Sequence, residues 1–319
     1  MKRKGIFDCL ADISYKKTDI NTYTENDWKV YNPYMIHRFL SMKEELIGIM
    51  NLVQKYYTLD KKTHYVLMSD ILPKQKLFAK YIKGKNYEII HYESPDKRGI
   101  DVALLYQKKY FTPIFHQSFN PNIYRNNRKV YTRDQLLVTG YLDDELIHII
   151  VNHWPSRSGG EIKSRPLREK AAYQNTKIIE QVRAMDLNAK IIIMGDFNDD
   201  PINTSFKNVL KTKSDKKKVT ENDIYNPYED MFQKGSNTLV FRDNINLFDQ
   251  LLITSPLLDK GEKDFSSYKM YKAMIFNKRF LTTKRGRYKG YPLRSFSFGK
   301  YTGGYSDHYP VYMYLIKEL

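Results

Sequence analysis

The alternation of hydrophobic and polar positions predicts two amphipathic helices, each followed by a buried strand. In residues 34–57, apolar side chains recur at steps of four and three, which places them on one face of a helix. Residues 168–186 repeat this spacing, with Asn175 among the positions on that face. Each helix leads into an apolar run without alternation, at residues 63–70 and 189–196, as expected for strands covered on both faces.

Strand patterns dominate the rest of the chain. They occur at residues 86–93, 101–107, 136–142, 146–153, 237–243, 247–254 and 310–316. Many strands in hairpin-like succession with few helices predict an α/β protein in which helices flank two packed sheets. The polar stretches 211–223 and 277–294 are too short to link domains, so we expect one domain over residues 1–319.

Charge and composition narrow the class of protein. The 319 residues are 41% hydrophobic, enough for a substantial core, and 53 Lys and Arg against 36 Asp and Glu give a net charge of +17. Such a surface favours polyanions, whether nucleic acid, phosphorylated metabolites or anionic lipid headgroups. Charge alone does not choose among these partners.

Cysteine content and hydropathy bear on metal chemistry and location. Cys9 is the single cysteine, which excludes an internal disulfide framework and a cysteine-based zinc site, so any metal must bind to oxygen or imidazole. Asp8 and Asp12 interrupt the apolar content of the N-terminus, and no run approaches the ~20 apolar residues of a membrane span. We therefore expect a soluble cytoplasmic protein.

Several predicted strands stop at residues suited to chemistry. These residues are Asp70, His153, Asp196, Asn198, Asp249, Asp307 and His308. Taken singly, each has a simpler explanation: Asp196 could cap a helix, and a lone histidine is usually structural. Asp249 is harder to explain, because a carboxylate in an apolar run needs a cation, a histidine or a metal.

The same residue types suit hydrolysis of a phosphoester. Hard divalent cations such as Mg²⁺ prefer oxygen ligands, which Asp70, Asp196, Asn198 and Asp307 supply. Hydrolysis also needs a positioned water, stabilisation of the phosphoryl oxygens and a proton for the leaving group. Histidines and the remaining carboxylate can meet those needs.

Six motifs in this order make the chain resemble the endonuclease/exonuclease/phosphatase superfamily. They are SPDKRGIDVALLY, YTRDQLLVTG, VNHWPSRSGG, IIIMGDFNDDP, NLFDQLLIT and GGYSDHYPVYMYL, and they span about residues 90–319. The resemblance implies a DNase I-like four-layered α/β/β/α sandwich of two mainly antiparallel sheets. It also implies a phosphoesterase that depends on Mg²⁺ or Mn²⁺.

The resemblance also implies roles for individual residues. Asp196 and Asn198 would orient the attacking water and contact the phosphate. His153 would stabilise the phosphoryl oxygens or protonate the leaving group. His308 would contact the phosphate or act as acid and base, oriented by a buried Asp249.

Metal and phosphate ligands are implied in the same way. Asp307 would bind the metal, and Asp70 stands where the family has a metal-binding glutamate. Arg98 and Arg157 would either hold phosphate or form structural ion pairs. Asp199 and Asp200, with the proline that follows, are expected only to turn the chain into the next helix.

The N-terminal segment, about residues 1–33, departs from the family pattern. Lys2 stands where an asparagine near the metal is usual, and Asp70 is one methylene shorter than glutamate. Three functions therefore stay open for what we expect to be a monomer: a nuclease, a phosphatase or phosphodiesterase for inositol phosphates or phospholipid headgroups, and a non-catalytic polyanion-binding protein. The basic stretches 211–218 and 284–294 would grip a nucleic-acid backbone in the first case.

Overall fold

The computed structural model describes residues 87–297 and 300–318. Within them, residues 293–297 and 300–307 belong to one compact unit and residues 87–292 and 308–318 to another. The first of these units, the smaller one among the described residues, contains the strand pair β14 (Phe296–Ser297) and β15 (Lys300–Tyr301). Whether residues 1–319 form one domain stays a prediction.

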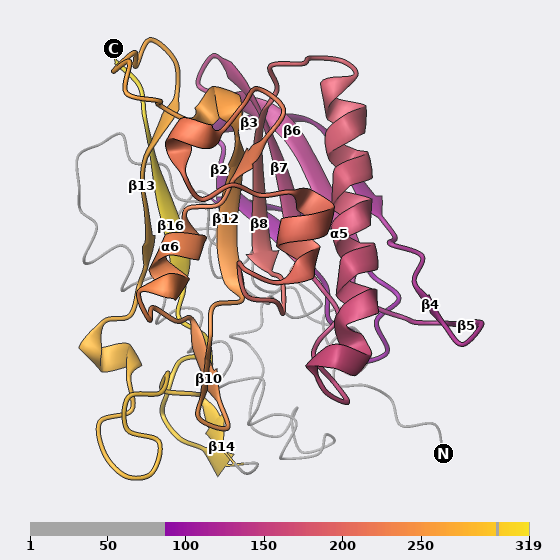
Figure 1. The fold of residues 1–319 in the computed structure, drawn as a ribbon, viewed down its shortest axis with the longest axis vertical. Helices are drawn as coiled ribbons and strands as arrows, with labels where there is room; N and C mark the ends of the chain where they lie inside the picture. Colours follow the sequence, from indigo (N-terminus) through magenta and orange to yellow (C-terminus); the bar gives the residue numbers. More distant parts are fainter. Residues whose placement is uncertain (1–86, 298–299, 319) are drawn as a thin grey trace, which may run out of the picture. The chain divides into compact units, whose positions relative to one another are not determined.

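A six-stranded sheet organises the larger unit (Figure 1). In spatial order its strands are β3 (Phe111–Phe119), β6 (Gln135–Leu142), β7 (Glu145–His153), β8 (Lys190–Asp196), β12 (Asp249–Thr254) and β9 (Ile224–Tyr225). All neighbours are antiparallel except β7 and β8. A parallel pair needs a crossover connection, and helix α5 (Glu161–Arg183) supplies it.

Strand β8 shows how the sheet separates two hydrophobic cores. Ile191 and Ile193 pack into the core beneath α5, whereas Ile192 and Met194 join the core on the opposite face. All of these side chains are buried, which explains why the strand has no polar alternation. The unalternating run therefore reflects burial on both faces.

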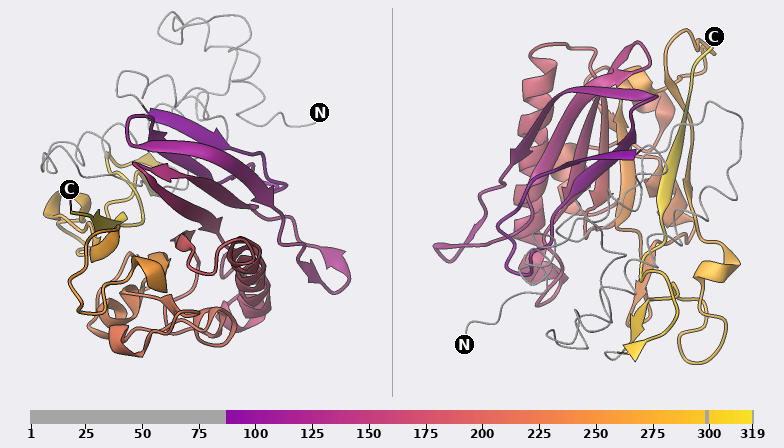
Figure 2. Two further views of the ribbon diagram at one scale, coloured as in Figure 1. Left: turned by 90° about the horizontal axis from the view of Figure 1, so that it is seen from above. Right: turned by 180° about the vertical axis from the view of Figure 1, so that it is seen from behind.

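Two strand pairs cover the second face of the sheet. They are β1 (Tyr87–His91) with β2 (Ala103–Gln107), and β13 (Lys269–Ile275) with β16 (Val311–Ile316). Figure 2 shows the β1–β2 pair on the side of the central sheet away from α5. The predicted α/β sandwich with mainly antiparallel strands is confirmed, while the predicted helix at residues 34–57 lies outside the described residues.

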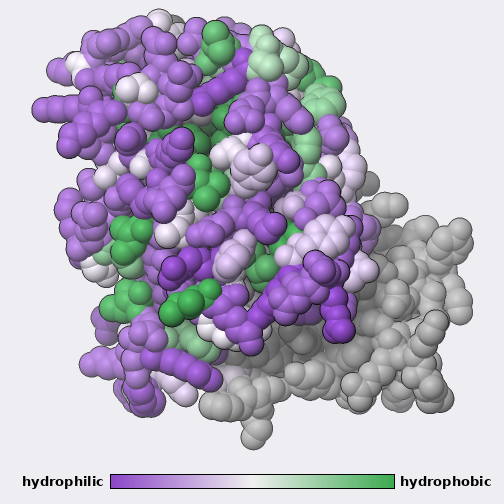
Figure 3. Space-filling view, turned by 45° about the vertical axis from the view of Figure 1, so that its right-hand side comes forward, coloured by the Kyte–Doolittle hydropathy of each residue, from purple (hydrophilic) through white to green (hydrophobic). Residues whose placement is uncertain are grey.

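Short elements complete the larger unit. They are β4 (Tyr124–Arg125), β5 (Arg128–Lys129), the π-helix η3 (Ser205–Leu210), the 3₁₀ helix η4 (Lys216–Lys218), α6 (Tyr228–Gln233), β10 (Leu239–Phe241), β11 (Asn244–Asn246), and the 3₁₀ helices η5 (Ser255–Leu257) and η6 (Arg279–Leu281). Figure 3 shows one face that is mostly hydrophilic, with hydrophobic residues in small separate groups. No helix in the described part of the chain has the length and apolar character needed to cross a membrane.

A close approach of two strands fixes the end of β8. Gly195 pairs with Asn152 of β7, and a Cβ atom at Gly195 would lie 2.0 Å from the Asn152 carbonyl oxygen. The φ angle of Gly195, +150°, also disfavours other residues. Only glycine lets β7 and β8 meet here.

Gly195→Ala is expected to lower the free energy of unfolding in urea by about 3 kcal/mol, because the new methyl group forces backbone atoms apart. Gly235→Ala is the matched control. Its φ of +83° carries similar strain, but no atom lies within 4 Å of the added Cβ. We expect the free energy of unfolding of this control to fall by only about 1 kcal/mol. Equal decreases in the two variants would contradict the packing argument.

Candidate active site

Strand register brings three of the predicted residues to one edge of the sheet. His153 ends β7 and pairs in parallel with Asp196, which ends β8. Asp249 begins β12 and pairs with Asp196 on its other side. Because β12 runs opposite to β8, its first residue lies at the edge where β7 and β8 end.

The side chains at this edge lie close together. His153 Nε2 is 3.5 Å from Asp196 Oδ2. His308, which precedes β16, places its Nδ1 2.8 Å from Asp249 Oδ2. Ligand atoms of Asp196, Asp249 and His308 all lie within 4.8 Å of one another. The expected contact between His308 and Asp249 is therefore present, although Asp249 is only partly buried and not fully buried as expected.

Asn198 is held beside Asp196 by a tight turn. Its φ is +51°, a left-handed conformation that asparagine tolerates better than most residues. Its backbone N–H donates to Asp196 Oδ1 at 2.8 Å, and its Nδ2 donates to the Trp154 carbonyl oxygen at 3.0 Å. Both bonds fix the amide next to the Asp196 carboxylate, so Asp196 closes this turn and does not cap the following helix.

A buried cluster of side-chain amides connects the ends of β7 and β8 to helix α5. Asn175 of α5 donates from Nδ2 to Asn152 Oδ1 at 2.6 Å, and Trp154 Nε1 donates to the same oxygen at 2.9 Å. Asn152, Trp154 and Asn175 are almost completely buried. Sequence reasoning assigned these residues no role, although a polar Asn175 on an apolar helix face was the available signal.

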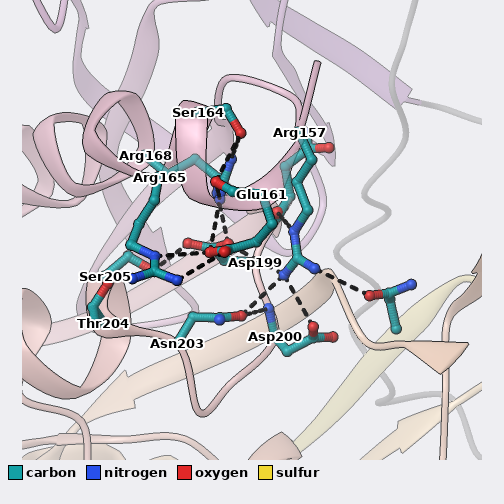
Figure 4. A network of polar contacts seen from close by, with 12 residues as sticks. Arg157, Glu161, Ser164, Arg165, Arg168, Asp199, Asp200, Asn203, Thr204 and Ser205 are labelled. Atoms are coloured by element: carbon teal, nitrogen blue, oxygen red, sulfur yellow. Dashed lines mark hydrogen bonds and ion pairs between the residues drawn. The ribbon is translucent and has the colours of Figure 1, made fainter. Parts of the chain in front are cut away.

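Arg157 is committed to an intramolecular network (Figure 4). Its Nε donates to the Asn198 carbonyl oxygen at 3.0 Å, and its Nη2 contacts Asp199 Oδ1 at 3.2 Å and Asp200 Oδ2 at 3.0 Å. Its guanidinium also lies over the Phe248 ring at 4.4 Å. Of the two roles left open for Arg157, these contacts favour the structural ion pair.

The prediction that Asp199 and Asp200 only turn the chain is wrong. Asp199 is fully buried, and Arg168 of α5 donates from Nε to its Oδ1 at 2.6 Å. Burial raises the pKa of Asp199 and lowers the pKa of Arg168, while their mutual attraction opposes both shifts. Asp200 accepts from the backbone N–H of Leu247 at 2.7 Å. These carboxylates therefore tie the loop after β8 to α5 and to the start of β12.

Arg98 lies at the same sheet edge, in the loop between β1 and β2. Its Nε donates to Asp96 Oδ1 at 3.3 Å, and Arg133 donates from Nη1 to Asp96 Oδ2 at 3.0 Å. Burial would raise the pKa of Asp96, but the hydrogen bonds from both arginines hold it below its usual value. Unlike Arg133, the Arg98 side chain is 57% exposed, so it has room for a ligand as well as its ion pair.

The two predicted metal ligands have different outcomes. Asp70 lies outside the described residues. Asp307 lies in the smaller compact unit, where Arg294 donates from Nη2 to its Oδ2 at 2.7 Å. Metal binding by either residue stays a prediction.

Comparison with known proteins identifies the family. A model of the endonuclease/exonuclease/phosphatase family matches residues 68–317. The chain belongs to this family. A search of curated proteins gave no match.

Several solved structures share the fold. A D. rerio TDP2 complexed with a single-strand DNA product is 11% identical, with 86% of this chain and 92% of that chain covered and a TM-score of 0.52. The human Nocturnin catalytic domain with bound sulfate is 13% identical over 86% of each chain, with a TM-score of 0.54. A Bacteroides thetaiotaomicron family protein is 14% identical over 90% and 94%, with a TM-score of 0.53.

Members of the endonuclease/exonuclease/phosphatase family hydrolyse phosphoester bonds and generally use divalent metal ions. The donor set at the sheet edge fits such an ion, because two carboxylates and an imidazole lie within 4.8 Å of one another. Asp196 and Asp249 supply the hard oxygen ligands that Mg²⁺ prefers. His308 and Asp249 also contact each other, with Nδ1 and Oδ2 at 2.8 Å.

Arg168→Met is expected to lower the free energy of unfolding by about 3–5 kcal/mol, because it leaves Asp199 buried without its main cationic partner. Arg165→Met is the matched control on the same helix. Arg165 is 38% exposed and pairs with Glu161 at the surface, so its loss should cost less than about 0.5 kcal/mol. Urea unfolding of both variants tests the prediction, and a small effect in Arg168→Met would show that the pair is dispensable.

Proposed function

We propose that this protein is a divalent-metal-dependent phosphoesterase that hydrolyses phosphodiester bonds, and that its substrate is nucleic acid. The observation that carries the proposal is the contact of His308 Nδ1 with Asp249 Oδ2 at 2.8 Å, at the same sheet edge as the close pair His153 and Asp196. Asp249 orients the imidazole of His308, and the pair lies beside His153 and Asp196. Such an arrangement is suited to proton transfer near an anionic phosphate.

Asp249 acts through His308 as a positioning residue. When Nδ1 donates its proton to Asp249, the imidazole is fixed in one tautomer and its Nε2 points away from the carboxylate. The same carboxylate stabilises the protonated ring. His308 can then exchange a proton with the substrate without changing its orientation.

Asp196 and Asn198 are suited to hold the attacking water. The Asp196 carboxylate accepts from the Asn198 backbone N–H at 2.8 Å, so it is oriented before any substrate arrives. The Asn198 side-chain amide, anchored to the Trp154 carbonyl oxygen, lies beside the same carboxylate. His153, 3.5 Å from Asp196, is placed to stabilise the phosphoryl oxygens or protonate the leaving group.

Mg²⁺ or Mn²⁺ is the proposed metal, with Asp196 as a ligand and Asp70 and Asp307 as further candidates. When bound, the ion would stabilise negative charge on the phosphoryl oxygens. Residues of the chain perform the other roles: water is held at Asp196, and protons move at His153 and His308.

Charge and chain topology favour nucleic acid over a small phosphoester. The net charge is +17, and β13 ends beside the start of β16, so the basic stretch 284–291, which follows β13, leaves the same edge as His308. The basic stretch 211–218 does not support substrate binding in the same way. Its Lys213 bridges to Tyr225, which pairs with Ile253 near the opposite end of β12.

Asp196→Asn is expected to reduce turnover of a fluorescent oligonucleotide in Mg²⁺ by about 10²-fold or more, because the carboxylate charge at the water and metal is lost. Asp230→Asn removes an exposed carboxylate on α6 and should leave the rate unchanged. Excess EDTA should abolish turnover, and Mn²⁺ should restore it. Activity that survives Asp196→Asn undiminished would refute the assignment of Asp196.

A substrate panel separates nucleic acid from the alternatives. Oligonucleotides, inositol phosphates and a phospholipid headgroup phosphodiester are offered in parallel with Mg²⁺. Preferential cleavage of the oligonucleotides is expected, because the basic loop and the net charge favour an extended polyanion. Turnover of the small phosphoesters alone would refute the nuclease proposal, and binding without any turnover would refute the phosphoesterase proposal.

Asp249→Asn tests the positioning role. We expect the rate to fall by about 10²-fold and its pH dependence to change, because an amide neither fixes the tautomer of His308 nor stabilises its charged form. An unchanged pH profile would mean that Asp249 supports the fold only. Thermal unfolding of the variant provides the check on folding.

A further inference from the structure

A β-hairpin outside the proposed catalytic group projects from the same sheet edge. Strand β3 ends at Phe119, which pairs with Gln135 at the start of β6, and the chain between them forms the hairpin β4–β5. The next residue of β6, Leu136, pairs with Val151 near the end of β7. Figure 1 shows the hairpin extending away from the body of the sheet.

The hairpin is well defined although it is exposed. Arg125 and Arg128 pair directly, which leaves Asn126 and Asn127 as a two-residue turn with φ values of +48° and +58°. Positive φ at both positions is the requirement of a type I′ turn, and asparagine meets it readily. At the base, the Val130 N–H donates to the carbonyl oxygen of the buried Ile123 at 2.8 Å.

The charge of the hairpin is not explained by folding. From Asn120 to Arg133 the chain has four basic residues and no acidic one. Arg125 and Arg128 face each other across the strands, an arrangement of like charges that destabilises a hairpin. Among the residues that the structure describes, neither has an acidic side chain within 4.0 Å.

Aromatic side chains accompany the positive charges. Tyr124 pairs across the hairpin with Lys129, and Tyr131 follows the second strand. They are 53% and 48% exposed, and Lys97 of the neighbouring loop lies over the Tyr131 ring at 5.4 Å. Exposed aromatic rings beside unpaired basic groups are the combination that binds nucleic acid by stacking and phosphate contact.

We propose that the β4–β5 hairpin is a binding arm for the phosphate backbone of a nucleic-acid strand whose scissile phosphate lies at His153 and Asp196. This inference rests on the proposed function for the position of the scissile phosphate. The base of the hairpin is two to three strand spacings from β8, or about 10–14 Å. At the duplex spacing of about 3.4 Å per phosphate along one strand, this distance corresponds to roughly three or four nucleotides from the cleaved bond.

The test compares two triple variants of equal charge. The arm variant carries Arg125→Gln, Arg128→Gln and Lys129→Gln, and keeps the asparagine turn and the buried base. The control variant carries Lys213→Gln, Lys217→Gln and Lys218→Gln, three exposed lysines near the opposite end of β12. Matching thermal unfolding temperatures establish that both variants fold like the unaltered protein.

Binding is measured by fluorescence anisotropy in EDTA with a single-stranded oligonucleotide of about 16 nucleotides. The arm variant should bind about tenfold more weakly at moderate salt, and the slope of log affinity against log salt should fall by about 2. The affinity of the control variant should fall by about twofold at most, because only its net charge is smaller. Equal losses in the two variants would overturn the proposal.

Turnover separates this inference from the proposed catalytic function. With Mg²⁺, the arm variant should show a raised KM for the oligonucleotide and unchanged kinetics on bis(p-nitrophenyl) phosphate, which is too small to reach the hairpin. A raised KM for both substrates would place the effect at the site and contradict the arm. If the unaltered protein hydrolyses neither substrate, the proposed function fails, and the anisotropy comparison alone decides whether the hairpin binds nucleic acid.

Discussion

The register of β8 between β7 and β12 is the constraint on which the site depends. Side chains alternate between the two faces of a strand, so a slip of one residue would turn Asp196 away from His153 and Asp249 together. Close contact at Gly195 and the amide cluster of Asn152 keep β7 and β8 in this pairing. The geometry of the candidate site is thus set by packing within the sheet.

Much of the fold could be predicted from hydrophobic patterning, because the buried strands are apolar without interruption. Strand β3 was missed, since several of its positions are exposed and Pro113 disfavours a strand assignment. Helix α5 begins at Glu161, whereas the predicted helix begins at residue 168. The prediction starts too late because the first turns of the helix are largely polar and show no hydrophobic periodicity. Strand β13 alternates weakly, because five of its seven residues are partly buried or exposed.

The common location of the candidate residues could be predicted better than their contacts. His153, Asp196, Asn198, Asp249 and His308 stood out because they lie at or beside the ends of apolar runs, and the structure brings them to one sheet edge. Side-chain orientation is decided by contacts between distant segments, and this is why Asp199 was misjudged. Its partner Arg168 lies in the crossover helix, and no local pattern around GDFNDDP reveals that contact.

The buried charges beneath the site also limit how this sequence can change. Replacing either Arg168 or Asp199 alone leaves a buried charge without its closest partner, whereas replacing both by apolar residues of similar volume can be neutral. Arg157 joins the same network and touches the Asn198 backbone. A change at Arg168 in helix α5 therefore determines which residues can replace Asp199 in the loop after β8. These two positions must change together.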